Sequence, residues 1–108
     1  MSDLDAQFEH DMIETVYRTS GRQTGYWAAY FLRAVKRHGG VPAAKRMLAT
    51  KGLSKGLITL HEKGRLDLAM ETLVLRPEYV SLFTDDERVT AERRLQEVRA
   101  RAVSAARS

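Results

Sequence analysis

The spacing of apolar residues constrains this chain more than any other feature of its sequence. No stretch alternates apolar and polar residues over four or more positions, as a half-buried strand would. Apolar residues recur instead every three or four positions, and proline occurs only at positions 42 and 77. A chain of 108 residues has room for one hydrophobic core. The sequence therefore predicts an all-α fold, a compact bundle of five to six helices in a single domain spanning residues 1–108.

Glycines and capping residues set the bounds of the predicted helices. The first helix is expected over residues 4–18 and to end in the segment TSGRQTG, where two glycines bracket polar residues. The third begins at VPAAKRML, with Pro42 in its first turn, and the fourth at about Ser54, which suits an N-cap. The second helix, between the first and the third, is expected over residues 26–38. Its inward side chains are expected to be Trp27, Tyr30, Phe31, Ala34 and Val35.

The second half of the chain is expected to hold the buried centre. The stretch LDLAMETLVL is apolar nearly all round and predicts one central helix capped by Asp67. Glu71 inside that helix needs a partner, and Arg65 or Arg76 is the expected cation. We expect this helix to be surrounded by the others.

A long Arg-rich helix is predicted over residues 84–108. Thr84 and Glu87 have the spacing of a capping box at its start. Small apolar residues, including Leu95, Val98 and Ala102, recur along it at steps of three and four. Two interpretations stay open: a seam for a homodimer, or packing within the chain followed by a frayed end.

The charges are divided unevenly along the chain. Residues 1–16 carry five acids and no Lys or Arg, whereas residues 17–65 carry eleven Lys or Arg and one acid, Glu62. We therefore divide the domain into an acidic N-terminal helix (1–20), a basic helical core (21–83) and the C-terminal helix (84–108). Because like charges repel at close range, such a block usually meets an anion. A nucleic acid, an acidic protein and the chain's own N-terminal helix all remain open as that anion.

Residues 41–65 have the outline of a helix–turn–helix pair, which favours DNA as the partner. The turn is several residues longer than the usual three to four, and Glu62 would repel phosphate. We nevertheless predict a nucleic-acid-binding accessory protein, with a module that docks on an acidic partner, such as a nuclease or defence complex, as the alternative. The predicted nucleic-acid contacts are Arg22, Arg33, Lys36, Arg37, Lys45, Arg46, Lys51, Lys55 and Lys63.

Catalytic motifs are incomplete in this sequence. GLSKG at residues 52–56 fits the G-x-S-x-G pattern of a nucleophile elbow, but an elbow needs a strand before its serine and a helix is expected there. His61 and Glu62 begin H-E-x-x-H, yet position 65 is arginine. His10 and Glu14 are too few ligands for a metal, and the chain has no cysteine. We predict a non-enzymatic protein without a cofactor or bound metal.

The N-terminus and the lengths of the apolar runs bear on localisation. The first twelve residues are acidic, where a signal peptide would be basic and then apolar. No apolar run approaches the roughly 18 residues that a membrane-spanning helix needs. A cytoplasmic protein without a membrane partner is therefore expected.

More than half of the chain, residues 39–95, carries a set of distinctive short motifs. They read GG-x3-A-x3-L, GRLDL followed by E-x-LVL, and LFT with acids leading to an Arg-rich helix. Here they are Gly39-Gly40, Ala44, Leu48, Arg65-Leu66-Asp67-Leu68, Glu71, Leu73-Val74-Leu75 and Leu82-Phe83-Thr84. The segment resembles an all-helical module of small uncharacterised bacterial proteins that is also appended to some restriction-type nucleases. The resemblance implies a self-contained helical module and an association with nucleic-acid processing, and it brings no catalytic residues.

Overall fold

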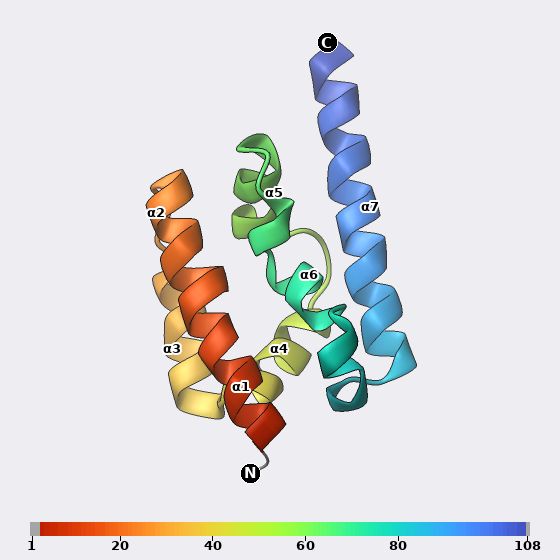
Figure 1. The fold of residues 1–108 in the computed structure, drawn as a ribbon. Helices are drawn as coiled ribbons and strands as arrows, with labels where there is room; N and C mark the ends of the chain where they lie inside the picture. The colour runs from red at the N-terminus through yellow and green to blue at the C-terminus, as the bar shows by residue number, and fades with distance from the viewer. Residues whose placement is uncertain (1–2, 108) are drawn as a thin grey trace.

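Two long helical rods lie on either side of a group of short helices (Figure 1). The computed structural model describes residues 3–107, with side chains through residue 101. The first rod joins α1 (Asp3–Asp11), the π-helix η1 (Met12–Thr19) and α2 (Ser20–Thr24) without interruption, and α7 (Asp85–Arg107) is the second. Between Ala29 and Leu82 the helices are α3 (Ala29–His38), α4 (Gly40–Leu48), α5 (Lys55–Glu62), η2 (Leu66–Leu68), α6 (Met70–Val74) and η3 (Pro77–Leu82). No strand occurs in the described part of the chain, so the all-α prediction is confirmed.

The first rod continues through residue 24, almost to the end of TSGRQTG, so the predicted helix end at residue 18 is wrong. In η1 the backbone is wound more widely, and the hydroxyls of Thr19 and Ser20 donate to carbonyl oxygens five residues earlier, at 2.8 and 3.3 Å. Gly21 stays helical and makes room for the Trp27 ring, because a Cβ there would lie 2.3 Å from it. The rod ends only at Gly25, whose φ of 77° lies in the left-handed region.

The main core joins the first rod to the middle of the molecule. Phe8 and Met12, four positions apart on this rod, are fully buried. The Phe8 ring packs edge-on against Tyr79, with ring centres 5.0 Å apart, and against Phe83 at 5.2 Å. The Tyr79 hydroxyl donates to the Asp11 carboxylate, and burial together with this hydrogen bond raises the pKa of Tyr79 to about 12. The acidic first helix is therefore fixed to the core by both apolar and polar contacts.

The predicted central helix is split into two short pieces. Leu66–Leu68 forms a 3₁₀ turn, Ala69 is extended, and α6 begins only at Met70. Asp67 does not cap a helix, because both of its carboxylate oxygens accept hydrogen bonds from Arg65 at 3.1 Å. Residues 68–71, 73 and 74 are nevertheless buried. The prediction of a buried centre is confirmed, and the prediction of one continuous helix is wrong.

Glu71 is paired, but with neither of the predicted cations. Its carboxylate oxygen lies 3.4 Å from Nη1 of Arg94 on α7, and both side chains are buried. Arg65 and Arg76 contact aspartates elsewhere in the molecule. Burial raises the pKa of the Glu71 carboxyl, and a backbone hydrogen bond and the charge of Arg94 offset only part of that rise. The pair joins α6 to α7 within the interior.

The other two predicted helix caps are confirmed. Ser54 Oγ accepts a hydrogen bond from the Leu57 N–H at 3.1 Å, at the start of α5. The Thr84 N–H donates to Glu87 Oε1 at 2.8 Å, and the Glu87 N–H donates to Thr84 Oγ1 at 3.1 Å. Ser54 in GLSKG therefore has the structural role of an N-cap.

Apolar side chains of α7 pack against other helices of the same chain. Leu95 is 5% exposed and Val98 is 1% exposed, in a second core cluster with Leu57, Leu60 and Leu68. Of the two interpretations left open by the sequence, internal packing holds for Leu95 and Val98, which leaves neither free for a dimer seam. Ala102 lies outside the described side chains.

Of the helices within residues 3–107, none is both long and apolar enough to cross a membrane.

Candidate nucleic-acid interface

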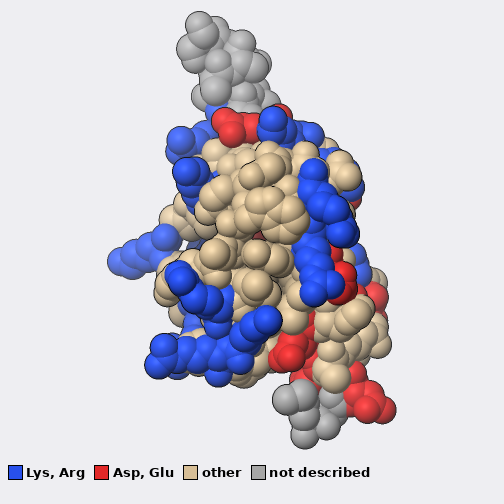
Figure 2. Space-filling model, turned by 90° about the vertical axis from the view of Figure 1, so that its left-hand side faces the viewer, with Lys and Arg blue, Asp and Glu red and all other residues tan. Residues whose placement is uncertain are grey.

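Eight of the nine predicted cations are exposed and lie more than 4.0 Å from any acidic group of the described residues. Lys and Arg side chains are concentrated on the face of the molecule that carries α2 and α3 (Figure 2). We call the eight residues the basic surface. They are Arg22, Arg33, Lys36, Arg37, Arg46, Lys51, Lys55 and Lys63.

Lys45 is the exception among the nine. Its Nζ lies 2.7 Å from Glu87 Oε1 and 5.3 Å from the centre of the Phe83 ring. These contacts tie α4 to the start of α7 and account for the side chain within the fold. We therefore leave Lys45 out of the basic surface.

Three acids of the first rod have partners other than the cations of the basic surface. Glu9 Oε1 accepts the Gly40 N–H at 2.9 Å, at the start of α4. Asp11 accepts the hydroxyl of Tyr79, and Glu14 pairs within its own rod at 2.8 Å. These three acids therefore form no ion pair with the basic surface, although the sequence left such pairing open.

His38, at the end of α3, lies beside two cations of the basic surface. Its pKa is lowered, first by desolvation and then by the positive charges of Arg46 and Arg37. Arg46 and Arg37 therefore lie close enough to His38 to disfavour its charged form.

Two large aromatic side chains are exposed among these cations. Tyr30 is 77% exposed and Trp27 is 48% exposed, so the prediction that both face inward is wrong. For Trp27 the reason is the start of α3 at Ala29, three residues later than expected, which leaves this residue outside the helix. Phe31 and Val35 keep their predicted inward positions.

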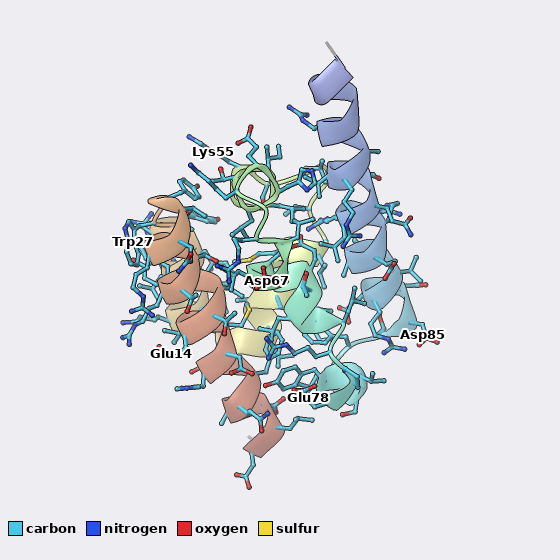
Figure 3. All side chains as sticks on the ribbon, turned by 45° about the horizontal axis from the view of Figure 1, so that its top comes forward. Glu14, Trp27, Lys55, Asp67, Glu78 and Asp85 are labelled. Atoms are coloured by element: carbon cyan, nitrogen blue, oxygen red, sulfur yellow. The ribbon has the colours of Figure 1, made fainter. Side chains whose placement is uncertain are left out.

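A pocket of about 330 Å³ opens beside the basic surface. Its apolar wall is formed by Val16, Phe31, Met47, Leu53, Leu57 and Met70. Lys51 and Lys55 line it as exposed residues, and Lys55 extends from α5 toward the side on which Trp27 lies (Figure 3). Glu71 and Arg94 line it as buried residues, at its inner end. The pocket therefore combines a cationic rim, an apolar wall and a buried carboxylate.

The segment GLSKG forms one side of this pocket. It lies within the predicted helix–turn–helix outline of residues 41–65, but no local pattern predicts a cavity behind a turn. Glu71 in an apolar stretch was the other available signal. Its position at the pocket follows from the packing of α6 against α7, which spacing along the chain does not reveal.

The predicted helix–turn–helix pair is present only in outline. Residues 49–54 separate α4 from α5, and α5 packs mainly on α7, not on α4. A reading helix is normally supported by the helix before it, at a tight turn. The basic surface, not this pair, is therefore the stronger candidate for a contact with nucleic acid.

Comparison of the chain with protein-family models, with curated proteins and with solved structures found no match. The resemblance of residues 39–95 to the bacterial helical module therefore stays a prediction. Within the described residues, no group of three or more His, Asp or Glu side chains could hold a metal ion.

Proposed function

We propose that the protein binds nucleic acid, with single-stranded DNA preferred, through the basic surface. One observation carries the proposal: eight exposed cations form no ion pair with any acid of the described residues, and exposed aromatic rings lie among them. Unpaired cations on a stable fold repel one another, and a polyanion relieves that repulsion. Cations would hold the phosphates and determine most of the affinity, as in other nucleic-acid complexes.

Trp27 and Tyr30 are the reason for preferring single strands. In a duplex the faces of the bases are stacked on one another, whereas an unpaired base can stack on an exposed ring. Trp27 rests on Gly21 and meets Tyr17 edge-on, with ring centres 5.5 Å apart, so its orientation is fixed. A fixed ring loses little freedom when a base stacks on it.

Paired charge reversals test the surface. We expect Arg33→Glu with Lys55→Glu to weaken binding of a fluorescent single-stranded oligonucleotide at least tenfold, measured by anisotropy at low salt. The matched control is Arg93→Glu with Arg99→Glu on α7, at the other side of the molecule, because it changes the net charge equally. Circular dichroism checks that both variants remain helical. Absence of binding by the wild type, or equal losses in both variants, would overturn the proposal.

An acidic protein partner is the competing function, and Tyr30 distinguishes the two. Stacking on an aromatic side chain contributes about 1–3 kcal/mol per base, so Tyr30→Ala should weaken single-stranded DNA binding by roughly fivefold or more. The same substitution should leave binding of poly-glutamate unchanged, because a carboxylate chain offers no aromatic ring. Equal losses for the two polyanions would favour the acidic protein.

A further inference from the structure

The pocket differs in construction from the basic surface beside it. Exposed lysines line its mouth, apolar side chains form its wall, and a charged pair with little exposure closes its inner end. Phosphate contacts alone need neither an apolar wall nor a buried carboxylate. The pocket therefore points to a ligand that is both planar and apolar and is attached to phosphate.

We propose that the pocket receives one unpaired nucleobase of a bound nucleic-acid strand, with Lys51 and Lys55 at the adjoining phosphates and Glu71 at the amino edge of the base. The inference rests on the proposed function and adds a base-selective site to it.

The size and walls of the pocket fit a single base. At about 330 Å³ it lies at the lower end of the roughly 300–1,000 Å³ typical of small-molecule sites. Phe31, Leu57 and Met70 offer the apolar contacts that the faces of a base need. At the rim, Tyr26 is held by its N–H, which donates to Thr24 Oγ1 at 3.1 Å, and by Lys55, whose Nζ lies 5.6 Å from the ring centre. The entrance thus carries an aromatic ring and a cation together.

Glu71 is a fixed acceptor at the inner end. Arg94 Nη1 lies 3.4 Å from one of its oxygens, and Nη2 of the same guanidinium donates to the carbonyl oxygens of Leu48, at 3.2 Å, and Thr50. The carboxylate is therefore held by a side chain that is itself anchored to the end of α4. A carboxylate fixed in this way can bind N–H donors of a base without being reordered first.

The carboxylate predicts which base is preferred. Guanine presents two adjacent N–H donors, N1–H and N2–H₂, which match the acceptor oxygens of a carboxylate. Thymine presents one N–H between two carbonyl oxygens, which a carboxylate repels. Adenine and cytosine have one amino group each and should fall between the two. We therefore expect guanine to bind most tightly and thymine most weakly.

The test uses single-stranded oligothymidine hosts of about a dozen nucleotides, a length within the range of known single-strand sites. Each host carries guanine, thymine or an abasic residue at one central position. The full-length protein should bind the guanine host about tenfold more tightly than the other two, the effect of one good carboxylate contact to a base. Anisotropy competition measures the three affinities.

Two variants connect any preference to the pocket. Glu71→Gln should abolish the preference for guanine while leaving binding of the all-thymine host within about twofold, because the basic surface is intact. Glu78→Gln, at an exposed glutamate of η3, is the matched control and should keep the preference. Should Glu71→Gln fail to fold, Ala28→Phe, which narrows the pocket from its half-buried rim, should abolish the preference as well.

The outcomes separate the inference from the function on which it rests. Equal wild-type affinity for the guanine, thymine and abasic hosts overturns the base site while leaving the proposed function in place. A preference that survives both Glu71→Gln and Ala28→Phe also overturns it. Binding of free deoxyguanosine monophosphate without binding of any oligonucleotide would overturn both and assign the pocket to a mononucleotide.

Discussion

The buried pair of Glu71 and Arg94 gives the fold its sharpest single test. Arg94→Met keeps a good helix former and much of the apolar volume of the side chain. It leaves the carboxylate of Glu71, a residue that is only 4% exposed, without its partner cation. Removing one partner of a buried pair costs about 3–5 kcal/mol, and the carbonyl oxygens of Leu48 and Thr50 lose a donor too. Since domains of this size have a free energy of unfolding of about 5–15 kcal/mol, the loss should consume a large part of it.

Urea denaturation followed by circular dichroism measures this loss. We expect the free energy of unfolding of Arg94→Met to be lower than that of the wild type by about 3–5 kcal/mol. Because 1 kcal/mol shifts the melting temperature of a domain of about 100 residues by roughly 4 °C or more, Tm should fall by more than about 10 °C. The slope of the urea transition should be unchanged if both proteins unfold in two states.

The pH dependence of the deficit has a definite sign. Burial raises the pKa of Glu71 in the folded state, so its contribution to stability is fully present below the unfolded value of about 4.3 and is lost as pH rises through the folded pKa. Without Arg94 that folded pKa rises further, so the deficit of Arg94→Met relative to wild type should shrink from pH 7 toward pH 5. The double variant Arg94→Met with Glu71→Gln should recover most of the lost stability at pH 7. A deficit below about 1 kcal/mol, or a double variant no more stable than Arg94→Met, would refute the reasoning.

Three further substitutions test individual contacts. Gly40→Ala places a Cβ 2.6 Å from the Glu9 Cα, so α1 must move away from α4. Urea denaturation should show a free energy of unfolding lower by about 1–3 kcal/mol. Unchanged stability would contradict the close approach of the two helices. Ser54→Ala removes the N-cap of α5 and should cost about 1 kcal/mol, whereas Ser54→Gly should cost only a few tenths. Lys45→Met should leave oligonucleotide affinity within twofold while Lys51→Met, an equal change in charge, weakens it; the reverse order would place Lys45 in the interface.

Local sequence patterns predicted local structure well in this protein. The N-cap at Ser54 and the capping box of Thr84 and Glu87 were correct because each depends on residues three positions apart. The inward positions of Phe31 and Val35 were correct because the period of the helix fixes which residues share a side. Helix caps and amphipathic stripes are properties of short segments, so the sequence alone is enough to find them.

Errors arose where contacts distant in sequence decide the structure. The glycine at position 21 looked like a helix breaker, yet it stays helical beneath the Trp27 ring. The partner of Glu71 lies 23 residues away on α7, so no local spacing could identify it. The candidate site shows the same difference between local and distant contacts. Eight of the nine predicted cations are exposed, as the sequence suggested. The ion pair of Lys45 with Glu87 and the pocket behind GLSKG depend on how the helices pack, so the sequence did not reveal them.

The salt dependence of oligonucleotide affinity tests the central claim most directly. Each phosphate neutralised on a single strand contributes about −0.7 to the slope of log K against log salt concentration. If roughly five of the eight cations of the basic surface contact phosphates, the slope should be about −3 to −4. Arg33→Glu with Lys55→Glu should bring the slope closer to zero by about one or more. A wild-type slope near zero, or no binding at low salt, would contradict the account.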